Sequence, residues 1–322
     1  MADDPLYTIA GLTIDSERAG ERRRLVDGVD LSVRRGEICG LAGESGSGKS
    51  ISMMASVGLA GGGLRIAGGT VAFNGSPADA GDQARLRGNL AHGISLLFQN
   101  AKGALNPFLR IDRQIGRALQ LQNVTPAQRR RKIEDLLAAV GLAPNEIGPK
   151  YAHQLSGGQA QRVAMACALA TEPSLLIADE PTTALDVTTE REILRFLTRL
   201  CRERAMAIVL VSHNLALISE YCSRINILHA GHIVESGTVA EVYASPLHPY
   251  TRGLLAAIPD VDEPRELIPL EGSVWGAGFA TGRCRFAHRC GQVTPRCIAS
   301  TPRLLNRDHH AVRCVLHEEH AA

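Results

Sequence analysis

Residues 43–50 read G-E-S-G-S-G-K-S and match the phosphate-binding pattern of a glycine, four residues and then Gly-Lys-Ser. Glycines let the backbone fold around a phosphate and aim several N–H groups at it, and a following helix adds the positive end of its dipole. Lys49 would reach the β- and γ-phosphates, and the Ser50 hydroxyl would bind Mg²⁺. A flexible Gly/Ser loop is the alternative interpretation. The nucleotide ligands predicted from this stretch are Gly43, Glu44, Ser45, Gly46, Ser47, Gly48, Lys49, Ser50 and Ile51.

A second candidate for chemistry is the acidic end of an apolar run, residues 175–180, which read L-L-I-A-D-E. In open α/β sheets, ligands bind at the carboxyl ends of the strands. Asp179 would hold Mg²⁺ through water, because Mg²⁺ prefers carboxylate and phosphate oxygens. Glu180 would orient or polarise an attacking water. Acidic turns after strands are common, so this signal gains its meaning from the phosphate-binding loop.

Residues 155–159 read L-S-G-G-Q, and with this motif the chain resembles the ATP-binding-cassette (ABC) ATPases, whose signature has that sequence. Arg162 follows at the usual offset, whereas Ala160 stands where Arg or Lys is commoner. Ser156 and the glycines would start a helix and present a hydroxyl, N–H groups and a helix dipole to a phosphate. An ordinary serine-capped helix start is the alternative. The nucleotide-binding residues implied here are Ser156, Gly157, Gly158 and Gln159.

The resemblance implies roles for three further positions. Gln99 matches the glutamine that senses the γ-phosphate and metal and faces the membrane partner. Residues 184–186 (A-L-D) match the loop that crosses the dimer, so Asp186 is expected near the nucleotide. His213 matches the switch histidine, which would hold the γ-phosphate and stabilise charge in the transition state. The implied catalytic residues are Glu180, His213 and Gln99, and the implied Mg²⁺ site uses Ser50, Gln99 and Asp179.

One feature of the family is missing. ABC ATPases often stack the adenine on an aromatic residue before the first glycine loop, but no aromatic residue stands between Tyr7 and Phe73. Tyr7 itself comes too early to be assigned this role. The sequence therefore leaves open how the adenine is stacked.

The resemblance also implies partners. In this family the phosphate-binding loop of one subunit and the signature of another enclose each ATP. This chain has one copy of each motif, so we expect it to work as half of a homo- or heterodimer. ATP would shift a population of open and closed pairs. The family further implies two transmembrane permease subunits, reached through a helical insertion, and indirectly an extracytoplasmic substrate-binding protein.

Three segments narrow the resemblance to importers of oligopeptides, dipeptides and nickel: residues 104–107, 181–187 and 245–255. Together with the motifs above, the resemblance covers roughly residues 6 to 317. It implies an ATPase that powers import of a small solute, with di- or oligopeptides as the expected cargo. A nickel or metal-chelate importer is the alternative, and a soluble ABC ATPase acting on DNA or ribosomes is an alternative of another class. An ATP-binding metal sensor is disfavoured, because Glu180 would complete a water-activating site.

Four of the eight cysteines crowd into the last forty residues, and their positions are Cys284, Cys290, Cys297 and Cys314. Four thiolates suit a [4Fe–4S] cluster or a structural Zn²⁺. The spacing matches neither a ferredoxin run nor a paired zinc ribbon, so it does not decide. A similar tail in peptide importers favours the [4Fe–4S] cluster, with Zn²⁺ and then plain thiols as alternatives. The histidines nearby are expected to be solvated: His288, His309, His310, His317 and His320.

The elements that must position these residues can be predicted from apolar patterns. Residues 6–42 contain short apolar runs separated by turns, which predict strands. A helix is predicted at residues 51–59, directly after the phosphate-binding loop, and another after Thr125, whose segment has capping-box residues. The unbroken apolar runs 175–178 and 207–211 predict central parallel strands.

The predicted fold class is therefore α/β: a P-loop NTPase ABC-ATPase core with an N-terminal antiparallel β-subdomain, an inserted helical subdomain and a small Cys-rich C-terminal module. The predicted domains are 1–258 for ATP binding, with helices at about 100–170, and 259–322 for the extension.

Composition limits the remaining options. The chain has 322 residues, of which 45% are hydrophobic and 21% charged, and a net charge of +2, so no nucleic-acid partner is expected. No run of eighteen or more apolar residues predicts a membrane span, and the acidic N-terminus is not followed by a signal core. We therefore expect a cytosolic protein, bound peripherally to the cytoplasmic face of the membrane if the resemblance holds.

Overall fold

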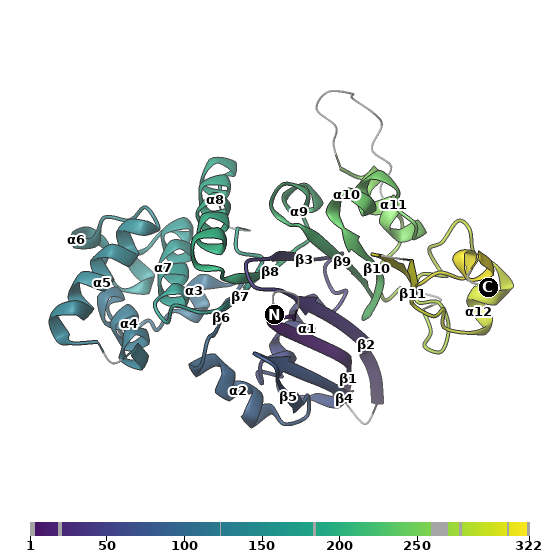
Figure 1. The fold of residues 1–322 in the computed structure, drawn as a ribbon, viewed down its shortest axis with the longest axis horizontal. Coiled ribbons are helices and arrows are strands. Elements are labelled where there is room, and N and C mark those ends of the chain that lie inside the picture. The colour runs from purple at the N-terminus through teal and green to yellow at the C-terminus, as the bar shows by residue number, and fades with distance from the viewer. Residues whose placement is uncertain are drawn as a thin grey trace. The chain divides into compact units, whose positions relative to one another are not determined.

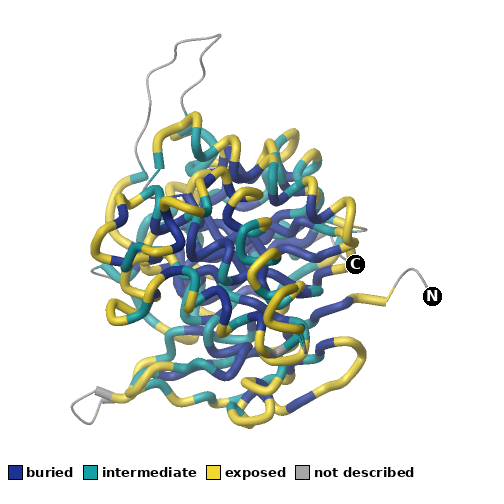
Figure 2. Tube along the Cα trace, turned by 90° about the vertical axis from the view of Figure 1, so that its left-hand side faces the viewer, coloured by how far each residue is buried: buried dark blue, intermediate teal, exposed yellow. Residues whose placement is uncertain are grey.

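The computed structural model describes most of the chain, namely residues 4–18, 21–122, 124–182, 185–258, 270–276, 279–307 and 309–320. It divides into two compact units. The first consists of Met1–Val33, Ile38–Leu86 and Val211–Ala322, and the second of Arg34–Glu37 and Arg87–Leu210. Continuous buried stretches alternate with exposed loops along the trace (Figure 2).

An antiparallel sheet occupies the N-terminal part of the first unit (Figure 1). Its strand order is β2-β1-β4-β5, and all three pairings are antiparallel. The antiparallel N-terminal sheet predicted from the sequence is therefore confirmed. The strand bounds are Tyr7–Arg18 (β1), Glu21–Val33 (β2), Leu64–Phe73 (β4) and Ser76–Asp79 (β5).

The same unit also holds five neighbouring strands of a second sheet, in the order β11-β12-β10-β9-β3. Strand β3 pairs with β9 in parallel, whereas β12 pairs with β10 antiparallel. The C-terminal residues thus contribute strands to the sheet that carries the phosphate-binding loop, while the predicted domain boundary at residue 258 stays a prediction. The bounds are Ile38–Ala42 (β3), Arg224–His229 (β9), His232–Thr238 (β10), Leu305–Arg307 (β11) and His310–Val312 (β12).

The helices of the first unit are short. Helix α1 ends at Ser56 although residues 51–59 were expected to be helical, because Gly58 adopts φ 80° and turns the chain. Helix α2 (Gln83–Ala91) crosses into the second unit. The other helices and their bounds are Lys49–Ser56 (α1), Leu215–Tyr221 (α9), Val239–Ala244 (α10), Pro249–Ala256 (α11) and Pro295–Ala299 (α12), followed by a 3₁₀ turn at Val315–His320.

The second unit combines three strands with a group of helices (Figure 1). Its strands have the order β8-β7-β6, and β6 pairs with β7 in parallel. Every residue of β7 and β8 is buried, as their unbroken apolar sequences predicted. The bounds are Ile94–Leu97 (β6), Leu175–Asp179 (β7) and Ala207–Ser212 (β8), the last of which ends in the first unit.

The helical insertion lies between β6 and β7. Helix α5 starts with the predicted capping box, in which the Gln128 N–H donates to Thr125 and the Gln128 side chain accepts from the Thr125 N–H. The bounds are Ala101–Ala104 (α3), Ile111–Ala118 (α4), Pro126–Ala139 (α5), Pro144–Ile147 (α6) and Gly157–Leu169 (α7), with 3₁₀ turns at Leu119–Gln122 and Ala152–Gln154; α8 follows β7 at Val187–Arg204. Among the described residues, no helix combines the length and apolar content needed to cross a membrane.

Candidate functional site

The loop between β3 and α1 has the backbone geometry that a phosphate cradle requires. Gly43, Gly46 and Gly48 have φ values of 147°, 79° and 107°, which residues with a side chain rarely adopt. A Cβ at Gly43 would lie only 2.2 Å from the carbonyl oxygen of Leu228. The glycine spacing read from the sequence is therefore a steric requirement of this turn.

Two side chains inside the loop are suited to a bound phosphate. Lys49 is only 5% exposed, and its Nζ donates to the carbonyl oxygens of Gly43 and Glu44 at 2.7 and 3.0 Å. Ser47 is fully buried, and its hydroxyl has no hydrogen-bond partner among the described residues. A buried ammonium group, an unpaired hydroxyl and a glycine cradle at a helix start together fit a phosphate ligand.

Side chains from far along the sequence hold the same loop. The guanidinium group of Arg289 donates to both carboxylate oxygens of Glu44 at 2.7 and 3.0 Å. The backbone N–H of Glu44 donates to the Tyr250 hydroxyl at 3.0 Å. The indole Nε1–H of Trp275 donates to the carbonyl of Gly46 at 2.8 Å. These contacts could not be predicted from the sequence, because no local spacing links the loop to the C-terminal residues.

In the second unit, the structure brings two predicted catalytic residues together. Asp179 is the last residue of β7 and is 3% exposed. Glu180 follows with φ 47°, a left-handed backbone that is unusual for glutamate and typical of functional turns. The Gln99 amide donates to the Glu180 carboxylate at 2.8 Å, two residues after β6 ends at Leu97.

The signature motif forms the start of α7. Ser156 caps the helix: its hydroxyl accepts from the Gln159 N–H at 3.2 Å, and the Gln159 side chain accepts from the Ser156 N–H at 3.2 Å. Ser156 and Gly157 are exposed, while Gly158 and Gln159 are half-buried. The ordinary serine cap is thus present, and it leaves the positive end of the helix open to solvent.

Two predicted residues stand at other element ends. Asp186 caps α8, and the hydrogen bond from the Thr189 N–H at 3.0 Å holds the pKa of this carboxyl below its ordinary value. His213 is exposed directly after β8. His213 lies in the first unit with the phosphate-binding loop, and Asp186 lies in the second. Ala184, predicted as part of the dimer-crossing loop, lies outside the described residues.

The four C-terminal cysteines lie near one another without forming a ligand set. Burial raises the pKa of the Cys284 thiol to about 11, and the thiols of Cys297, Cys314 and Cys290 add to the rise. All four thiols are free. Across the described ranges, no group of three His, Cys, Asp or Glu side chains is placed to hold a metal ion. The predicted [4Fe–4S] cluster and its Zn²⁺ alternative therefore have no support from the geometry.

Two histidines near these cysteines make polar contacts within the protein, which the sequence did not predict. His310 contacts the fully buried carboxylate of Glu235 at 2.7 Å, and His317 contacts the Leu247 carbonyl at 3.1 Å. The expectation of solvated histidines is wrong for these two residues.

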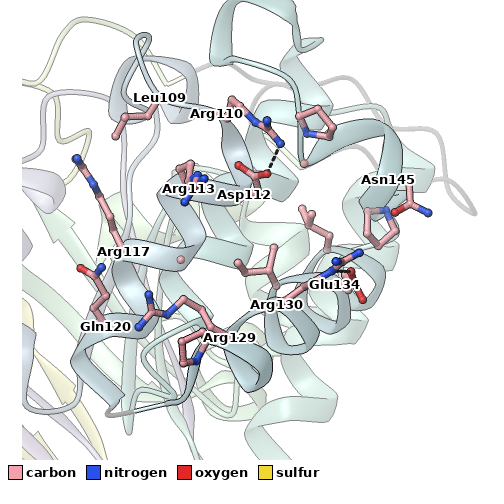
Figure 3. Close-up of a pocket in the computed structure, with 17 residues that line it drawn as sticks. Leu109, Arg110, Asp112, Arg113, Arg117, Gln120, Arg129, Arg130, Glu134 and Asn145 are labelled. Carbon is pink, nitrogen blue, oxygen red and sulfur yellow. Dashed lines mark hydrogen bonds and ion pairs between the residues drawn. The ribbon is translucent and has the colours of Figure 1, made fainter.

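A groove of about 850 Å³ lies in the helical part of the second unit, between α4, α5 and α6 (Figure 3). Five arginines are among the residues that line it, and Arg110 forms an ion pair with Asp112 there. Phe108, next to the lining residue Leu109, is 85% exposed. The arginines are Arg110, Arg113, Arg117, Arg129 and Arg130.

Comparison with known proteins gives consistent similarities. Residues 26–183 match the ABC transporter family, and residues 234–297 match the oligopeptide/dipeptide transporter C-terminal region. The oligopeptide transport ATP-binding protein AppD of Bacillus subtilis (strain 168) is 40% identical over 305 residues, covering 92% of each chain. The dipeptide transport ATP-binding protein DppD of Escherichia coli (strain K12) is 39% identical over 284 residues, covering 87% of each chain.

Among solved structures, the dimeric structure of MJ0796, a bacterial ABC transporter cassette, is similar with a TM-score of 0.66 at 27% identity. The match covers 72% of this chain and 98% of that one. A dimeric post-hydrolysis state of the same cassette, bound to ADP and Pi, matches with a TM-score of 0.65 at 26% identity.

Proposed function

We infer the function of this chain from its family: it belongs to the ATP-binding subunits of ABC transporters, in the branch with the oligopeptide/dipeptide transporter C-terminal region. The chain is an ATPase whose hydrolysis of ATP powers import. Its relatives are named for oligopeptide and dipeptide transport, which supports small peptides as the cargo. The single observation that carries the ATPase activity is the glycine-lined loop that closes on the buried Lys49 at the start of α1.

The proposed roles follow from the chemistry of each side chain. Lys49 and the loop N–H groups bind the β- and γ-phosphates. Ser50 and Asp179 would hold Mg²⁺, with Gln99 as a further ligand, and the metal ion would neutralise charge on the phosphates. Glu180 orients the attacking water and accepts its proton. The hydrogen bond from Gln99 supports this role, because it holds the Glu180 carboxylate in position before substrate binds.

The remaining site residues act on the transition state and across a dimer. His213 stabilises charge that develops on the γ-phosphate. Ser156 and its glycines bind the ATP held by a second ATPase subunit, and Asp186 lies at the same interface. The exposure of Ser156 and Gly157 supports this proposal, because a partner's nucleotide can reach the start of α7.

The permease subunits are proposed to contact the helical groove of the second unit. Five arginines of the groove offer charged contacts (Figure 3). The exposed Phe108, next to the lining residue Leu109, offers an apolar anchor. Such a contact holds the chain peripherally at the cytoplasmic face of the membrane. This contact is tested with Phe108→Ala in cells that co-express the permeases. We expect the variant to lose membrane association.

The water-activating role of Glu180 is tested by Glu180→Gln. We expect ATP binding to persist, phosphate release to fall by at least about a hundredfold, and a nucleotide-bound dimer to accumulate. The dimer is measured by light scattering, with the chain alone and with a co-expressed second ATPase subunit. Glu203→Gln, at an exposed position of α8, is the control with normal turnover. Wild-type phosphate release from Glu180→Gln would remove Glu180 from the mechanism.

An iron–sulfur cluster is a separate hypothesis, which rests on the four C-terminal cysteines of the sequence and on the resemblance of the tail. No reaction step is assigned to it. Anaerobic purification followed by visible absorbance and metal analysis tests it, and a colourless, metal-free protein ends the hypothesis.

A further inference from the structure

We propose that Arg289 is a positioning residue for nucleotide binding: it neutralises the Glu44 carboxylate inside the phosphate-binding loop, so that the loop can accept a triphosphate. The inference rests on the proposed function, because it takes ATP as the ligand of this loop. It assigns the C-terminal segment a direct part in the affinity for nucleotide.

The burial and geometry of the Glu44–Arg289 pair indicate a permanent contact. The side chain of Arg289 is 2% exposed and that of Glu44 is 28% exposed, and two parallel hydrogen bonds join them. Such bidentate pairs are stronger and more specific than single contacts. Arg289 also donates to the carbonyl oxygens of Glu271 at 2.7 Å and Leu270 at 3.2 Å. These extra bonds hold the guanidinium group in place, whether or not a ligand is present.

The position of Glu44 makes this neutralisation necessary. Glu44 is the second residue of the loop that has to bind a triphosphate, and a bare carboxylate there would repel the ligand. Lys49 donates to the Glu44 backbone carbonyl, not to its carboxylate. Arg289 pairs with the carboxylate instead, so Glu44 does not neutralise the positive charge of Lys49.

Two further contacts from the C-terminal part of the chain hold the loop backbone rather than its charge. Tyr250 accepts the N–H of Glu44, and Trp275 donates to the carbonyl of Gly46. The ring centroid of Trp275 in turn lies 4.3 Å from the guanidinium carbon of Arg23. A role of Arg289 limited to holding the backbone would therefore overlap with these contacts, whereas its charge is not duplicated by them.

The experiment compares Arg289→Met with Arg289→Met/Glu44→Gln in the full-length chain. Methionine keeps an apolar stem but removes the charge. We expect the single variant to weaken ATP binding by about tenfold or more and to weaken the binding of inorganic tripolyphosphate equally. The KM for ATP should rise while kcat is kept. The double variant should recover most of the lost affinity, because the repelling carboxylate is gone. Arg252→Met, at an exposed position of α11, is the control with unchanged affinity.

The outcomes separate the possibilities. Wild-type protein that binds no ATP contradicts the proposed function itself. Wild-type protein that binds ATP, with an unchanged Kd in Arg289→Met, overturns the inference. A loss that Glu44→Gln does not recover also overturns it, because it indicates a structural clamp. If thermal melting shows that Arg289→Met does not fold, Arg289→Gln replaces it, because glutamine removes the charge and keeps hydrogen-bond donors. Weaker ATP binding that Glu44→Gln recovers then supports charge neutralisation, and any other result rejects it.

Discussion

Gly43 is the residue on which the shape of the phosphate-binding loop depends most directly. Its φ is 147°, and a Cβ at this position would lie 2.2 Å from the Leu228 carbonyl oxygen, so there is no room for a side chain. The Lys49 ammonium group donates to the carbonyl of Gly43, so a shift of this backbone also displaces that group.

Substitution of this glycine is therefore expected to affect both folding and binding. Gly43→Ala should lower the free energy of unfolding by about 1–3 kcal/mol and abolish most ATP binding, because the loop or β9 has to move. Thermal melting and a nucleotide titration measure the two effects. Gly61→Ala is the matched control, because a Cβ there meets nothing within 4 Å. Equal melting of the two variants would refute the steric argument.

At the scale of elements, the cap of helix α11 makes the stability of the protein depend on pH. The imidazole of His248 caps α11: its Nδ1 accepts the Tyr250 N–H at 3.0 Å, which requires a neutral ring. Burial lowers the pKa of His248 to about 3 and that of His232 to about 4. Helix α11 also carries Tyr250, which contacts the phosphate-binding loop, so its cap supports the site.

The sign of the pH effect follows from these lowered values. In the unfolded chain these histidines bind protons below about pH 6.5, whereas in the folded chain they stay neutral. The stabilisation is therefore complete above pH 6.5 and is lost progressively as the pH falls towards the folded pKa values, about 4 for His232 and about 3 for His248. At pH 5, His248 alone should cost about 2 kcal/mol of unfolding free energy. Chemical denaturation at pH 7.5 and pH 5 measures this loss. His248→Asn keeps a capping oxygen and should show a loss smaller by that amount; an identical loss would contradict the assignment.

At the scale of the whole molecule, binding should stabilise the chain by mass action. At an ATP concentration a hundred times Kd, the free energy of unfolding should rise by about 2.7 kcal/mol. Differential scanning calorimetry with Mg²⁺ and a non-hydrolysable ATP analogue measures the rise. Lys49→Met should abolish it, since the ammonium group is lost from the loop. A full rise in that variant would show that the nucleotide binds elsewhere.

The motifs with local geometry could be predicted from sequence. The loop 43–50, the capping box at Thr125, the serine cap at Ser156 and the buried strand before Glu180 each depend on residues within a few positions, so their spacing in the sequence reveals them. The end of α1 was mispredicted, because one glycine at position 58 outweighed an apolar pattern. Four cysteines suggested a metal site, but spacing carries no information on where their thiols point.

What the sequence determined by itself was the chemistry: a phosphate-binding loop, an acidic strand end and a signature helix, each encoded in adjacent residues. Only the tertiary structure decided what surrounds that chemistry. The contacts from Glu44 to Tyr250 and Arg289, and from Gly46 to Trp275, join residues 206, 245 and 229 positions apart. Such contacts depend on strand pairing, as between β12 and β10, and on packing of the whole unit, which no local pattern of residues specifies.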